Sequence, residues 1–187
     1  MIRYCPYCGQ QVEARVPTGD DRLRAVCDTC GYIHYENPRL VLGAVAEWEG
    51  RILLCRRAIE PRMGLWTLPA GFMENGESSL EAAARETREE AQAEIEAAEL
   101  FALIDVPGID QVHVFYRARL VAGKHAPGSE SLETRLFSEI DIPWQDLAFP
   151  TNACCLELYF ADRQKGVFRC HQTTLTGWKR SHEIVAD

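Results

Sequence analysis

Two pairs of cysteines near the N-terminus constrain this chain's fold more than any other feature. They follow the pattern Cys5-x2-Cys8 and Cys27-x2-Cys30, with 18 residues between the pairs. Two matched pairs at this spacing are typical of a tetrahedral zinc site, although buried cysteines or a redox pair are alternatives. Four thiolates leave no open coordination position, so the predicted Zn²⁺ is structural. We therefore expect residues 1–36 to form a zinc ribbon.

Length, composition and charge exclude several other classes of protein. The 187 residues suit one ordinary domain with a small appendage, and 47% hydrophobic with 26% charged residues fits a globular protein. The N-terminus lacks the apolar core of a secretory signal, so we expect a cytoplasmic protein. A net charge of −8 argues against a general nucleic-acid binder. It does not exclude an anionic small substrate, because bound cations would invert the local field.

The rest of the chain predicts a mixed α/β domain over residues 37–166, followed by a C-terminal tail over residues 167–187. We expect a helix that begins near Ser78, with Ser78 or Ser79 as its N-cap, and a second helix that ends at Gly166. The segment from Val167 is ambiguous. The expected strands lie in 40–57, around the turn "EWEG", and in 66–71, 100–108, 112–123 and 133–144.

Three glutamates share one arc of the first predicted helix. With about 100° per residue and Glu86 at zero, Glu89 lies about 60° to one side and Glu90 about 40° to the other. Oxygen ligands in that number suit Mg²⁺, with Mn²⁺ as a substitute, and a solvated acidic face is the alternative. We expect the helix to pack through a separate stripe of small or apolar residues, Leu80, Ala83, Ala84, Thr87 and Ala91.

The residues around this helix follow a fixed spacing, Gly71-x5-Glu77-x7-Arg85-Glu86-Thr87-x-Glu89-Glu90. This spacing resembles the Nudix box, GX5EX7REUXEEXGU, at every charged position and at the first glycine. Gln92 stands where the box has its final glycine. A non-glycine residue at positive φ there would cost of order 1 kcal/mol, so the substitution affects the helix exit and not the ligands.

The resemblance implies a fold and a set of site residues. The fold is an α/β/α sandwich around a mixed sheet, preceded by the zinc ribbon. The activity is hydrolysis of a nucleoside diphosphate linked to another moiety. A downstream carboxylate is also expected, with Glu133 as the candidate and Glu130 as its rival. By position in the box, the Mg²⁺ or Mn²⁺ ligands are Glu86, Glu89, Glu90 and the carbonyl of Gly71, while Arg85 orients a carboxylate and Glu77 braces the loop.

Over nearly its whole length the chain resembles the zinc-ribbon Nudix enzymes that include the plant FAD and ADP-ribose pyrophosphatases. The stretches "ENPRLVLGAV" and "APGSESLETRLF" carry this resemblance outside the box. It implies cleavage of FAD to FMN and AMP, or of ADP-ribose to AMP and ribose 5-phosphate. The candidate substrate contacts are Arg56 and Arg57 for the phosphates and Trp66 and Phe72 for an aromatic ring.

Three alternatives remain open from the sequence. An NADH pyrophosphatase would carry an "SQPWPFPxS"-like array, which residues 93–125 lack. An RNA-cap hydrolase would need clustered basic residues, and a non-catalytic zinc-ribbon binding module would have a degenerate box. Neither feature is present. The expected partner is a small-molecule nucleoside diphosphate derivative. A second copy of the chain is also expected, because homodimers are common among such enzymes.

Overall fold

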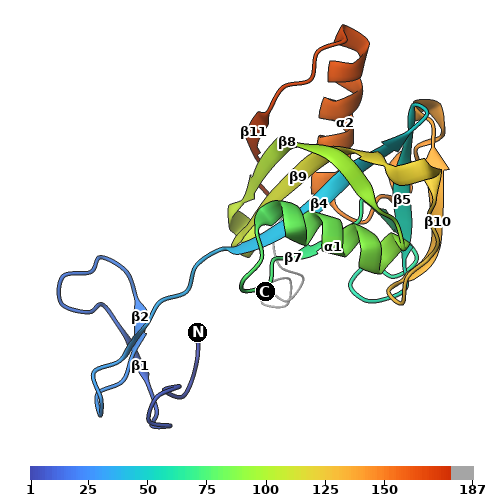
Figure 1. The fold of residues 1–187 in the computed structure, drawn as a ribbon. Helices are drawn as coiled ribbons and strands as arrows, with labels where there is room; N and C mark the ends of the chain where they lie inside the picture. The colour runs from blue at the N-terminus through green and yellow to red at the C-terminus, as the bar shows by residue number, and fades with distance from the viewer. Residues whose placement is uncertain (178–187) are drawn as a thin grey trace. The chain divides into compact units, whose positions relative to one another are not determined.

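The computed structural model describes residues 1–177 of the chain, which divide into two compact units. The first unit is Met1–Pro38 and the second begins at Arg39 (Figure 1). The predicted ribbon boundary, after residue 36, lies two residues before this division. No helix in the described range is long and apolar enough to cross a membrane. Residues 178–187 of the predicted tail lie outside the described residues.

The first unit is a small antiparallel sheet of order β1-β2-β3. Its strands are short because the two cysteine turns interrupt the chain, and its buried apolar residues number only a few. The strands are β1 (Glu13–Arg15), β2 (Arg24–Val26) and β3 (Ile33–His34).

The second unit is a mixed sheet with two α-helices, which confirms the predicted α/β class. Its strands are β4 (Arg39–Trp48), β5 (Arg51–Arg57), β6 (Trp66–Thr67), β7 (Ala70–Phe72), β8 (Ile95–Val106), β9 (Gln111–Leu120), β10 (Ser131–Phe137) and β11 (His171–Thr174). Its α-helices are α1 (Ser79–Ala91) and α2 (Pro150–Lys165), and its 3-10 helices are η1 (Pro107–Ile109), η2 (Val121–Gly123), η3 (Glu139–Asp141) and η4 (Trp144–Asp146).

The sheet has the strand order β10-β5-β4-β9-β8-β11, with β6 beside β5 and β7 beside β4 (Figure 1). Two of its pairs are parallel, β4 with β9 and β8 with β11, and the others are antiparallel. Because β7 pairs with β4, the loop that precedes α1 starts from the middle of the sheet. This position sets the site described below.

The two α-helices cover opposite faces of the sheet, as neighbouring residues of β5 show. Leu53 packs in a cluster with Ala91 of α1, whereas Leu54 packs with Leu156 and Tyr159 of α2. Successive side chains of a strand point to opposite faces, so α1 and α2 sandwich the sheet. The main core lies on the α2 side, where Phe101, Phe115 and Phe137 join it.

Both predicted α-helices begin or end as their terminal residues indicate. Ser78 is the N-cap of α1 and forms a capping box with Glu81: Glu81 N donates to Ser78 Oγ at 3.3 Å, and Ser78 N donates to Glu81 Oε2 at 2.7 Å. Gly166 caps α2 in the left-handed conformation, with φ 70°. Both predictions are confirmed.

The segment from Val167, ambiguous in sequence, contains the edge strand β11. Its anchor is the buried Asp162 of α2, which accepts hydrogen bonds from Arg169 N at 3.0 Å and from His171 Nε2 at 2.7 Å. These contacts turn the chain back to pair with β8. The polar sequence "HQTT" carries no apolar alternation, so pattern reading could not find this strand.

Candidate metal centres and active site

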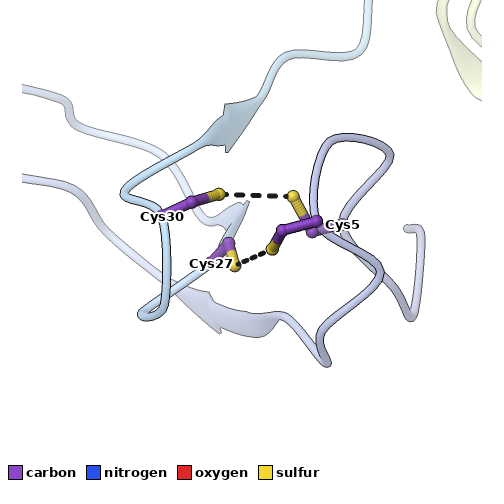
Figure 2. A group of neighbouring side chains, drawn as sticks. Cys5, Cys27 and Cys30 are labelled. Atoms are coloured by element: carbon purple, nitrogen blue, oxygen red, sulfur yellow. Dashed lines mark hydrogen bonds between the residues drawn. The ribbon is translucent and has the colours of Figure 1, made fainter.

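The four paired cysteines come together at one point of the first unit. Their Sγ atoms all lie within 4.8 Å of one another, with Cys8 to Cys27 at 3.5 Å. The Sγ atoms of Cys5 and Cys30 lie 3.6 Å apart (Figure 2). A tetrahedral Zn²⁺ with Zn–S bonds of about 2.3 Å separates its sulfurs by about 3.8 Å. The four thiolates therefore fit a closed zinc site without rearrangement of the chain.

Matching turns present these thiolates. Gly9 N donates to Cys5 O at 2.9 Å, and Gly31 N donates to Cys27 O at 2.8 Å. Both glycines have φ above +70°, a region that a β-carbon disfavours. A backbone hydrogen bond from Cys30 lowers the pKa of Cys27 to about 7, whereas contacts with neighbouring thiols raise the pKa of Cys8 and Cys30. Cys27 is therefore the thiol that ionises most readily in this cluster.

In the second unit, the carboxylate of Glu86 lies against the backbone of Gly71. A β-carbon built on Gly71 would come within 2.4 Å of the Glu86 carboxylate, and the φ of Gly71 is not in the left-handed region. Gly71 is therefore needed for space and not for backbone freedom. Burial raises the pKa of Glu86, although Arg85 opposes this effect.

Glu90 is the most enclosed of the three carboxylates, with 7% of its surface exposed. Its Oε2 accepts a hydrogen bond from Ala70 N at 3.2 Å. Burial raises the pKa of Glu90 to about 8; the charges of Glu86 and Glu130 add to the rise, and Arg57 opposes it. A buried carboxylate among like charges favours a bound cation.

Arg85 holds several carboxylates of this region through its guanidinium. Its Nη1 donates to Glu86 Oε1 at 2.7 Å and to Glu89 Oε2 at 2.9 Å. Its Nη2 donates to Glu77 Oε1 at 2.8 Å and to Phe72 O at 3.0 Å. The bonds from Arg85 lower the pKa of Glu77 to about 2. One guanidinium thus ties the loop before α1 to the helix and relieves the repulsion among its glutamates.

The carboxylates are less tightly gathered than the thiolates. Among the described residues, the four cysteines are the only group of three or more His, Cys, Asp or Glu residues whose ligand atoms lie close enough together to hold a metal ion as they stand. The guanidinium of Arg85 lies between Glu86 and Glu89, since its Nη1 donates to both. Oxygen donors from one helix suit a hard cation that retains several waters, so the residues present fit Mg²⁺ or Mn²⁺.

The predicted packing face of α1 is partly wrong. Leu80, placed in the packing stripe, is 40% exposed, whereas Glu86 and Glu90 are buried beside Ala82 and Ala83. A helical wheel assigns glutamate to solvent, but here β7 offers the space at Gly71 and the amide of Ala70 to receive two carboxylates. Only Glu89 of the three is exposed.

The two candidate downstream carboxylates differ in their relation to the glutamates of α1. Cys55 of β5 packs with α1, so Arg57 shares the α1 face and Arg56 points to the other face. Glu133 pairs with Arg56, with Oε2 to Nη1 at 3.9 Å, and so lies away from Glu90. The charge of Glu130, by contrast, contributes to the raised pKa values of both Glu86 and Glu90.

The four predicted substrate contacts fall in different environments. Phe72 is 45% exposed, with the guanidinium of Arg39 5.5 Å from its ring centroid. Trp66 packs against the core, edge-on to Phe137 at 4.8 Å. Arg57 Nε donates to Pro61 O at 2.9 Å. Arg56 Nε donates to Gly64 O at 2.9 Å, so both arginines also brace the loop after β5.

Replacing Gly71 with alanine is expected to displace Glu86, because the new methyl group overlaps its carboxylate. We expect Mn²⁺ affinity to fall by about 10–100-fold, the range seen when a ligand's support is lost. Titration of Mn²⁺ followed by electron paramagnetic resonance measures this.

Gly50→Ala is the matched control: the φ of Gly50 is +76° and the added methyl group meets nothing within 4 Å. It should lower stability by about 1 kcal/mol and leave Mn²⁺ binding unchanged. Equal affinities for the two variants would contradict the role of Gly71.

Comparisons with known proteins agree with the two units. A family model described as "Nudix N-terminal" matches residues 3–36, and one described as "NUDIX domain" matches residues 37–157. Among solved structures, the chain is similar to a NUDIX hydrolase from Nitrosomonas europaea, with 46% identity and a TM-score of 0.90. That match covers 93% of this chain and 99% of the other.

Two curated relatives carry more specific names. The chain is 29% identical to "NAD-capped RNA hydrolase NudC" of Stutzerimonas stutzeri over 163 residues, which is 86% of this chain and 57% of that protein. It is 27% identical to "ADP-ribose pyrophosphatase" of Methanocaldococcus jannaschii over 116 residues, which is 60% of this chain and 69% of that protein. The chain thus spans little more than half the length of the NudC relative.

Proposed function

Because the chain belongs to the NUDIX domain family, we propose that it is a divalent-cation-dependent hydrolase of the pyrophosphate bond in a nucleoside diphosphate derivative, ADP-ribose or FAD. The observation that carries this proposal is the burial of Glu86 and Glu90 against β7, with raised pKa values. Burying two like charges on one helix is unfavourable, and Arg85 contacts only Glu86 of this pair, so a bound cation would offset the remaining cost. A non-catalytic binding module would not need this arrangement.

The proposed ligands of Mg²⁺ or Mn²⁺ are Glu86, Glu89 and Glu90 with the carbonyl of Gly71. The cation would supply Lewis-acid polarisation of a phosphoryl oxygen and a nucleophile derived from water. We assign the downstream carboxylate to Glu130, since Glu133 lies on the opposite face of the sheet beside Arg56.

The remaining residues bind and orient in this proposal. Arg85 donates hydrogen bonds to Glu86 and Glu89 and holds both carboxylates in place, and Glu77 fixes Arg85 in turn. Arg57, on the face that carries Glu90, is the better placed arginine for a phosphate. The exposed ring of Phe72, next to Gly71, is the proposed platform for a base. Arg56 and Trp66 would support the loop and the core that border it.

Product analysis tests the reaction. Purified protein with Mg²⁺ is incubated in parallel with ADP-ribose, FAD and NADH, and the products are separated by chromatography. The proposal predicts AMP with ribose 5-phosphate, or AMP with FMN. Glu130→Gln should lose most of this activity, and Glu133→Gln should retain it. Turnover of none of the three substrates by protein with one bound Zn²⁺ would sink the assignment.

Hydrolysis of NAD-capped RNA is the second candidate. It is favoured by the match to the NudC relative, which runs through 86% of this chain. A short 5′-NAD RNA belongs in the same experiment, and release of nicotinamide mononucleotide would select it. The described surface of the first unit argues against strong RNA binding, because Arg15, Arg22 and Arg24 each pair with an aspartate.

We also propose that the first unit holds one structural Zn²⁺ and that the protein is a homodimer. The zinc proposal is supported by the four clustered thiolates. The dimer proposal rests on the family resemblance, and light scattering during size-exclusion chromatography would measure the mass.

A further inference from the structure

The loop between β9 and β10 is bound to the end of the glutamate-bearing helix α1. Ala126 N donates to Ala91 O at 2.8 Å, and Gly128 N donates to Glu90 O at 3.0 Å. The last carbonyls of a helix have no partner within the helix. The loop supplies partners for two of them, so this end of α1 is completed by residues more than 30 positions away in sequence.

A third contact in the same place comes from a side chain. Gln92 caps α1 with φ 47° and ψ 37°, the left-handed region in which glycine is favoured. Its Nε2 donates to Pro127 O at 2.7 Å, and Pro127 lies between the two residues that make the backbone contacts. A glycine at position 92 would adopt the same backbone more easily but could not make this bond.

The backbone of the loop packs directly against the backbone of α1 at Gly128. A β-carbon on Gly128 would lie 1.7 Å from Glu89 O. Two residues further on, the carbonyl of Glu130 accepts a hydrogen bond from Ala58 N at 2.8 Å. The loop is therefore held at both ends, by α1 at residues 126–128 and by the segment after β5 at Glu130.

We propose that Gln92 is a positioning residue: its hydrogen bond to Pro127 O fixes the loop that brings Glu130 to the carboxylates of α1. This inference rests on the proposed function, because it gives Glu130 a role at the metal site. Pro127 has no N–H of its own to donate, so its carbonyl is the polar group by which the side chain of Gln92 can hold the loop at this residue. The hydrogen bond that fixes the loop, and with it Glu130, then offsets the cost of the strained φ of Gln92.

Two substitutions at position 92 separate positioning from simple stability. Gln92→Gly removes the donor and relieves the strained φ, whereas Gln92→Met removes the donor and keeps the strain. Both should weaken Mn²⁺ binding to the substrate-free protein by about tenfold, measured by electron paramagnetic resonance. The Tm of Gln92→Gly should lie above that of Gln92→Met. A residue with only a structural role would change the Tm and leave the affinity for Mn²⁺ unchanged.

Combining each variant with Glu130→Gln completes the test. If Gln92 acts through Glu130, the double variant binds Mn²⁺ no more weakly than Glu130→Gln alone. Additive losses overturn the inference, as does full Mn²⁺ affinity in Gln92→Gly and Gln92→Met. If Glu130→Gln binds Mn²⁺ with full affinity, the inference about Gln92 is also overturned. If Glu90→Gln loses Mn²⁺ affinity in the same experiment, the proposed metal site still stands. Full affinity in Glu90→Gln would contradict the proposed function itself.

Discussion

Glu90→Gln is expected to lower turnover by at least about 10³-fold and, at the same time, to raise the Tm of the Mg²⁺-free protein. The loss of turnover is expected because the amide would remove a charged ligand from the proposed metal centre. The gain in stability follows because glutamine fills the same space, 7% exposed, without a buried charge. Steady-state kinetics and thermal unfolding in metal-depleted buffer measure the two effects.

The raised pKa of Glu90 also predicts how the stability of the protein changes with pH. Burial raises the pKa of Glu90 in the folded protein to about 8, above the unfolded value of 4.5. Between these values the folded state retains a proton that the unfolded state has lost, so stability falls as pH rises. Metal-free wild-type protein should therefore lose stability relative to Glu90→Gln from about pH 4.5 to pH 8. Added Mg²⁺ should stabilise the wild type at pH 8 and not the variant.

A matched control separates this effect from loss of any glutamate. Glu96 on β8 is exposed and pairs with Arg119 at 3.2 Å. Glu96→Gln removes the same charge and should retain wild-type turnover, because Glu96 lies on the surface and surface ion pairs contribute little to stability. If Glu90→Gln retained more than a tenth of wild-type turnover, Glu90 would not be a ligand.

Cys27→Ser is expected to unfold the first unit and leave the second unit folded. Two of the few buried residues of the first unit, Cys5 and Cys27, are themselves proposed zinc ligands, and the others are Pro17, Ala25 and Val26. A core of this size cannot offset the entropy of folding, whereas structural Zn²⁺ contributes about 10–16 kcal/mol in small zinc domains. The thiolate cluster is thus the main source of stability for Met1–Pro38.

Metal analysis and NMR together measure this outcome. Wild-type protein should contain one Zn²⁺ per chain, and Cys27→Ser should contain none. In the ¹H–¹⁵N spectrum, amide peaks of residues 1–38 should collapse to the random-coil region while those of the second unit stay dispersed. Cys170→Ser, at an exposed cysteine outside the cluster, is the control and should keep its zinc. Dispersed peaks from a zinc-free first unit would contradict the prediction.

Local signals in the sequence were sufficient for some features and not for others. Ser78 and Gly166 act on their own helix ends, so their roles follow from adjacent residues. The side chains of Glu86 and Glu90 are buried because they pack against β7. A helical wheel drawn for α1 alone contains no information about this strand. The choice between Glu130 and Glu133 depends on strand register, because the pairing of β10 with β5 is irregular between Ser131 and Glu133.

That irregularity acts as a phase shift in the alternation of β10. Ser131 stands opposite Arg57 and Glu133 opposite Arg56, so Leu132 is the extra residue of a β-bulge. Ser131, before the bulge, therefore shares the α1 face with Arg57, and Glu133, after it, shares the opposite face with Arg56. Deleting Leu132 would remove the bulge and leave both pairs in place. The register of β10 after the bulge thus directs Glu133 away from α1, and the glutamate that we propose to approach α1 is Glu130, in the turn before the strand.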